Sequence, residues 1–184
     1  MLPPRANRGG STVMRTMKKL VSVIDSVSSW AGRISMWGCL ALVLVLSFEV
    51  VMRYVFDRPT IWAHEMSMML GVFIVTIGWA WVHLNHGHVR VDVFYTRLSP
   101  RGKAITDIVA FLIFFLPLLA VLIAAAGRMA WDAYVFDEVL MTSFWYPPAL
   151  PIRIVVLVGL VLFLVQGIAE FARDVYVVVK GAKP

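Results

Sequence analysis

Charged side chains are scarce in this sequence of 184 residues. Asp, Glu, Lys and Arg make up 15% of it and hydrophobic residues 60%, whereas soluble domains carry roughly 25% charged residues. The mean hydropathy is +0.82. A chain this short exposes much of its surface, so a fold in water would need more polar side chains to cover it. The scarcity of charge excludes an ordinary soluble globule and favours a membrane protein.

Cysteine and catalytic motifs are equally scarce. Cys39 is the single cysteine, so no intramolecular disulfide is possible. A nucleophile with a base and an orienting group, a glycine-rich phosphate loop and a helical H-E-x-x-H are all missing from the sequence. We therefore predict that the chain is not an enzyme and that it holds no cofactor.

Four long apolar stretches are what the sequence does contain. They predict transmembrane helices at about 34–52, 63–84, 105–127 and 152–171, because a span needs about 20 apolar residues. Pro117 predicts a kink in the third span. A cleavable signal peptide is the alternative for the first stretch, but the polar region before it is too long. We predict an all-α integral membrane protein with its four transmembrane helices in a bundle.

The distribution of basic residues predicts the topology. Of the 17 Lys and Arg residues, 13 precede the first span, lie between the second and third, or follow the fourth. By the positive-inside rule, both termini and the middle loop are then cytoplasmic. Topology thus explains the net charge of +6, and we expect no nucleic-acid partner.

Residues 14–31 show a different pattern, in which apolar side chains recur at helical spacing and basic residues and serines fill the other face. This pattern predicts an amphipathic interfacial helix on the inner leaflet, ending near Trp30. An extension of the first span is the alternative. We expect cytoplasmic tails at 1–13, which is disordered, and at 173–184, with the four-helix membrane domain at 32–172.

The loop after the third span carries aromatic residues at 144–146, which are typical of an interfacial belt. It also carries three acids: Asp132, Asp137 and Glu138. They suit either a solvated surface or a contact with a partner outside the membrane.

Two acids lie near the membrane edge. Glu49 and Arg53 are four residues apart, in the favourable order for a helical ion pair. Glu65, three residues after Trp62, lies at nearly the same depth and is expected to share Arg53 or Arg58. The two interpretations are an ion or proton site and a polar staple between helices. We favour the staple, because transport sites usually lie near the midplane.

The four histidines are His64, His83, His86 and His88. A haem held by two histidines needs ligands on two helices, but the first, third and fourth spans contain none. A metal site at the last three histidines lacks an acid or a thiolate. The segment 88–92 is instead interpreted as a loop lock, in which Asp92 pairs with Arg90 or Arg97.

The midplane of every span is apolar, without the acids or broken helices that transporters use. We therefore do not expect this chain to transport alone. Two glycine pairs, Gly71 with Gly78 and Gly159 with Gly167, are spaced to allow close contact between helices.

Several segments together resemble a known family. They are Glu49-Val-Val-Met-Arg53-Tyr-Val-Phe, Pro59-Thr-Ile-Trp62-Ala-His-Glu65, Gly87-His88-Val-Arg90-Val-Asp92 and the P-P-A-L-P-I-R entry to the fourth span. The chain resembles the small membrane subunit (DctQ type) of tripartite ATP-independent periplasmic (TRAP) transporters over about 34–171. The stretch 99–107 and the pair Gln166-Gly167 look most like the branch linked to 2-oxo acids, lactate and similar organic acids.

The resemblance implies a three-part system in the bacterial inner membrane. A periplasmic binding protein captures an organic acid, a large membrane subunit moves it with sodium by an elevator mechanism, and the small subunit acts as a scaffold for the large one. Sodium and membrane lipids are then expected ligands of the complex. The matching positions are assigned to structure and assembly: Glu49, Arg53, Trp62, Glu65, His88, Arg90 and Asp92. An autonomous homodimeric transporter is the alternative.

Overall fold

The computed structural model describes residues 8–85 and 99–180 of the chain. The elements in this part are α1 (Arg8–Tyr54), α2 (Ala63–Leu84), α4 (Pro100–Ala110), the π-helical turn η1 (Phe111–Phe115), α5 (Leu116–Val135) and α6 (Leu150–Lys180). The stretches long and apolar enough to cross a membrane are Lys19–Tyr54, Ala63–Leu84, Arg101–Val135 and Leu150–Val179. Each predicted span lies within one of them, so the all-α fold with four transmembrane helices is confirmed.

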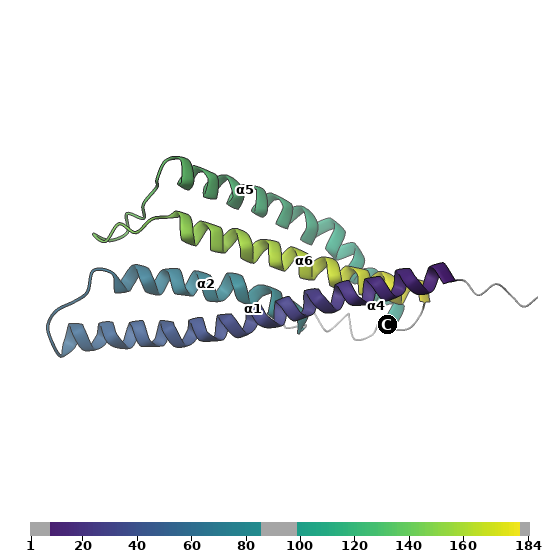
Figure 1. Ribbon diagram of the computed structural model, residues 1–184, viewed down its shortest axis with the longest axis horizontal. Coiled ribbons are helices and arrows are strands. Elements are labelled where there is room, and N and C mark those ends of the chain that lie inside the picture. The colour runs from purple at the N-terminus through teal and green to yellow at the C-terminus, as the bar shows by residue number, and fades with distance from the viewer. Residues whose placement is uncertain (1–7, 86–98, 181–184) are drawn as a thin grey trace, which may run out of the picture.

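The four spanning helices stand in a row. Figure 1 shows them side by side in the order α5, α6, α2, α1. In agreement, α2 packs against α1 and α6, while α6 packs against α2, α5 and α4. In this bundle α2 and α6 lie in the centre and α1 and α5 at the edges, and α1 also packs against α6.

The two ends of the row hold different parts of the chain. Loops 55–62 and 136–149 connect α1 to α2 and α5 to α6 at one end, which we call the loop end. The N-terminus of α1 and the C-terminus of α6 lie at the opposite end, the termini end. Consequently α2 and α6 run parallel to each other, and each runs antiparallel to the edge helix beside it.

Small residues let the central helices approach closely. A Cβ atom added to Gly159 of α6 would lie 2.6 Å from the carbonyl oxygen of Thr76 in α2, and one added to Gly167 would lie 2.4 Å from the Phe115 ring. Gly78 faces Ser35 of α1, whereas Gly71 has nothing within 4 Å. The expected glycine contacts are therefore present at three of the four positions, and Gly71 faces open space.

The first helix differs from the prediction. α1 is continuous over 47 residues, about 70 Å at 1.5 Å per residue, with no break near Trp30. It begins at Arg8. Gly32 does not interrupt the helix. It lies where the side chain of Trp81 from α2 approaches α1, and an added Cβ would be 2.4 Å from the Trp81 Cγ.

The predicted kink at Pro117 takes the form of a π-helical turn. Pro117 has no N–H to donate to the preceding turn, and the N–H of Leu116 bonds to the carbonyl of Phe111 five residues back. The extra residue in η1 brings Phe111 and Phe115 onto α6, where Phe111 stacks on Phe171 with ring centroids 4.8 Å apart.

Candidate functional site

Glu49 fixes the turn between α1 and α2. Its Oε1 accepts hydrogen bonds from Arg53 Nη2 at 2.7 Å and Nε at 3.2 Å. Its Oε2 accepts from the backbone N–H of Thr60 at 3.1 Å and from the Thr60 hydroxyl. We call Glu49, Arg53 and Thr60 the turn clamp. The predicted pairing of Glu49 with Arg53 is present, and the clamp holds loop 55–62 against the end of α1.

Trp62 strengthens the same junction. It is the residue before the first turn of α2, and its ring stacks on that of Phe48 in α1, with centroids 5.8 Å apart and planes at 27°. An aromatic contact of this kind contributes about 0.5–1.5 kcal/mol beyond its buried area. Trp62 therefore orients the start of α2 against α1.

Glu65 has a different environment from the one predicted. The residue is only 2% exposed, and within the described part of the chain neither carboxylate oxygen has a hydrogen-bond partner. Arg53 is occupied by Glu49, so the expectation that Glu65 shares Arg53 or Arg58 is wrong. Glu49 instead bonds to Thr60, which lies in the loop just before α2. Glu65 lies in the first turn of α2, where the helix dipole favours a negative charge.

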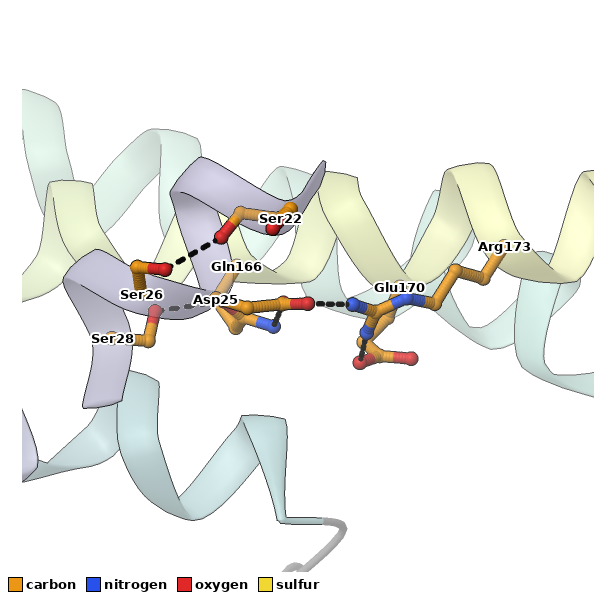
Figure 2. A network of polar contacts seen from close by, with 7 residues as sticks. All are labelled: Ser22, Asp25, Ser26, Ser28, Gln166, Glu170 and Arg173. Carbon is orange, nitrogen blue, oxygen red and sulfur yellow. Dashed lines mark hydrogen bonds and ion pairs between the residues drawn. The ribbon is translucent and has the colours of Figure 1, made fainter. Parts of the chain in front are cut away.

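A second polar network joins α1 to α6 at the termini end (Figure 2). Ser28 Oγ donates to Gln166 Oε1 at 2.7 Å, and Gln166 Nε2 donates to Asp25 Oδ1 at 3.3 Å. Arg173 forms ion pairs with both Asp25 and Glu170. Gln166 is fully buried and Ser28 is 2% exposed. We call these five residues the α1–α6 network.

The α1–α6 network was not predicted from the sequence. Asp25 and Ser28 were expected within a helix on the membrane surface, and in the structure both side chains point toward α6 (Figure 2). One signal was available. Gln166 is the only polar residue between Arg153 and Glu170, and an isolated polar side chain in a span often bonds across to another helix.

Loop 136–149 folds as a hairpin with internal hydrogen bonds. Leu140 N–H donates to the Pro147 carbonyl at 2.9 Å, and Ala149 N–H to the Glu138 carbonyl at 2.8 Å. Glu138 also pairs with Arg153, whose Nη1 donates to the Met129 carbonyl of α5 at 2.6 Å. Glu138 is therefore a structural residue that ties the hairpin to both helices.

The other predicted site residues and the histidines belong to two parts of the chain. His88, Arg90 and Asp92 lie outside the described residues, so the loop lock stays a prediction. His83 lies in an aromatic cluster, 5.5 Å from the Phe115 ring and 5.3 Å from the Phe163 ring.

The polar contacts described above serve to connect elements of the fold. The turn clamp, the α1–α6 network and the hairpin each use polar groups to hold one element against another. In residues 8–85 and 99–180, no group of three or more His, Cys, Asp or Glu side chains could hold a metal ion. The polar groups of these three regions thus connect helices and loops to one another.

Comparison with known proteins gives one family. A family model described as tripartite ATP-independent periplasmic transporters, DctQ component, matches residues 42–176. The match spans 135 of the 184 residues and includes the turn clamp, Gln166, Glu170 and Arg173. No curated protein matches the chain.

Proposed function

Because this chain belongs to the DctQ family of TRAP transporter components, we propose that it is the scaffold subunit that anchors and stabilises the large transport subunit. The chain is a multi-pass protein of the bacterial inner membrane. In the proposed complex, a periplasmic binding protein delivers an organic acid, such as a dicarboxylate or a 2-oxo acid. The large subunit binds sodium and moves the acid by an elevator mechanism, and this chain is not an enzyme.

The row of helices is the observation that carries this proposal. A transporter binds its cargo between helices near the bilayer midplane, whereas in this row the central helices α2 and α6 pack directly against each other (Figure 1). The buried Gln166 and Ser28 are engaged with each other. Helices arranged side by side in this way suit a subunit that stays fixed in the membrane while a domain of the large subunit moves beside it.

The apolar faces of the row support the same role. Large apolar side chains on the edge helices are more than half exposed, among them Val43 and Leu44 on α1 and Leu118 and Val121 on α5. Lipid or the helices of a larger membrane protein would cover such faces. Helix association in a membrane depends on close packing of small and apolar side chains, which these faces offer along their whole length.

The proposed topology places the loop end in the periplasm and both termini in the cytoplasm. The turn clamp and the hairpin would then lie on the side of the binding protein. The proposal also assigns Glu49, Arg53, Trp62, Glu65, His88, Arg90 and Asp92 to structure and assembly. At the termini end, Leu20, Val23 and Val27 are exposed on α1, and this half of the helix would lie against the inner leaflet.

Reconstitution tests the proposal. Proteoliposomes holding this chain alone, and others holding it with the large subunit, would receive the binding protein and a sodium gradient. Uptake of a labelled 2-oxo acid and of a labelled dicarboxylate would be measured in each. We expect uptake of one of them by the complex only. Uptake by this chain alone would overturn the proposal and favour an autonomous homodimeric transporter.

A further inference from the structure

Arg33 is an exposed cation on the outer side of a spanning helix. It is the last charged residue of α1 before an uncharged stretch that runs to Phe48. Its neighbours Gly32 and Ser35 are buried against α2, where Ser35 donates to the Ile74 carbonyl at 2.7 Å. Because Gly32 and Ser35 face α2, Arg33 points away from the row.

Two tryptophans flank Arg33 on the same side of the helix. The Arg33 guanidinium lies 5.8 Å from the centroid of the Trp30 ring, a cation–π distance. Trp30 is 61% exposed and Trp37 is 72% exposed. Tryptophan is enriched where a membrane meets water, so this cluster marks the level at which α1 enters the hydrocarbon at the termini end.

Three other arginines of the described residues have carboxylate partners. Arg53, Arg153 and Arg173 each form an ion pair with a carboxylate. In the described residues, Arg33 has the Trp30 ring as its neighbour and no ion pair. A cation at the edge of the hydrocarbon is costly unless an anion or water meets it, and the anion present all along this face is the phosphate of a phospholipid.

We propose that Arg33, flanked by Trp30 and Trp37, binds the headgroup phosphate of a phospholipid in the leaflet at the termini end. The guanidinium presents a planar set of donors that matches two phosphate oxygens. The two indole rings border the headgroup and pack along the first part of the acyl chain. The site would fix the depth of the edge helix α1 in the bilayer. This inference depends on the membrane location of the chain and is independent of the scaffold role.

An exposed arginine near an exposed tryptophan also occurs at the opposite edge of the row. Arg128 on α5 is exposed, and Trp131, three residues further on, is 65% exposed. This pair lies near the loop end, so the two edge helices carry an arginine and a tryptophan at opposite membrane faces. The repetition supports a role in contacting headgroups.

Native mass spectrometry of the full chain with added phosphatidylglycerol tests the site. Arg33→Gln should weaken the tightest lipid adduct by roughly tenfold or more, because a charge-assisted hydrogen bond is lost. Arg33→Lys should weaken it less, since it keeps the charge. The matched control is Arg58→Gln, which removes an exposed arginine at the loop end and should leave the adduct unchanged.

Three results would overturn the proposal. The first is equal lipid binding by the unaltered chain and the Arg33→Gln variant. The second is an equal loss in the Arg33→Gln and Arg58→Gln variants, which would indicate attraction to surface charge in general. The third is displacement of the lipid by millimolar inorganic phosphate, which would indicate an anion site without lipid specificity. Circular dichroism of each variant checks the fold, and Arg33→Lys provides the comparison if Arg33→Gln does not fold.

Discussion

Replacing Gly159 by alanine tests the contact between the two central helices. The new Cβ would lie 2.6 Å from the Thr76 carbonyl oxygen and 2.7 Å from the Thr76 carbonyl carbon, whereas an ordinary contact begins at 3.4 Å. These two atoms belong to the backbone and cannot rotate away, and the third neighbour, the Thr76 Cβ at 2.8 Å, is attached directly to it. If the two helices move apart along the line from the new Cβ to the Thr76 oxygen, they must separate by about 0.8 Å, the difference between 3.4 and 2.6 Å.

The energetic cost follows from two opposing effects. Alanine favours a helix over glycine by about 0.8–1 kcal/mol, and overpacking a tight contact costs about 1–3 kcal/mol. Gly71 lies on α2 with nothing within 4 Å, so Gly71→Ala carries the helix-propensity gain without the clash. The propensity gain cancels in the comparison, and the Gly159→Ala variant should be about 1–3 kcal/mol less stable than the Gly71→Ala variant.

Unfolding in a mixture of mild detergent and sodium dodecyl sulfate, followed by tryptophan fluorescence, would measure this difference. Thr76→Ala should not rescue Gly159→Ala, because it leaves the carbonyl group in place. Equal stability of the Gly159→Ala and Gly71→Ala variants would refute the close approach of α2 and α6. Rescue by Thr76→Ala would show that the side chain, and not the backbone, makes the contact.

Three further predictions use the same assay. Gly167→Ala should also destabilise the fold, but Phe115→Leu should rescue it, because the added Cβ would meet the Phe115 ring rather than backbone; failure of the rescue would contradict this packing. Gln166→Leu should cost about 0.6–2 kcal/mol, because it leaves the buried Ser28 hydroxyl without its acceptor; unchanged stability would show that this network does not hold α1 to α6. Glu65→Gln should unfold at an equal or higher detergent fraction, because it removes a buried carboxylate without a partner; a clear loss of stability would mean that the carboxylate is engaged by a group outside the described residues.

The transmembrane helices could be predicted from the sequence, because charge is excluded from the hydrocarbon and marks where each span begins or ends. The span predicted at 63–84 has the same bounds as α2, and the other three lie inside longer helical stretches, of which the third comprises α4, η1 and α5. Those helices continue because the residues beyond the hydrocarbon keep bonding to neighbours. Asp25 and Ser28 of α1 do so with α6.

The arrangement of the helices could not be predicted in the same way. In a soluble protein the polar face of a helix indicates its outer side, but in a membrane both lipid-facing and helix-facing side chains are apolar. The sequence therefore could not indicate that α1 packs on α2 and not on α5. Two glycines with similar surroundings in the sequence, Gly71 and Gly159, prove to face open space and a backbone carbonyl respectively.

Polar pairs were predictable only within one helix. Glu49 and Arg53 are four residues apart, so helical geometry alone brings them together. Ser28 and Gln166 are 138 residues apart, and their pairing depends on the packing of α1 on α6. Glu65 was assigned a partner by its depth in the membrane, but depth does not determine which way a side chain points around the helix.

The scaffold role is the central claim, and affinity purification in mild detergent tests it most directly. The tagged full chain would be isolated from its native membrane, and the proteins bound to it would be identified by mass spectrometry. The account predicts recovery of a much larger membrane protein with many transmembrane helices. A homodimer without such a partner, able to move an organic acid when reconstituted alone, would contradict it.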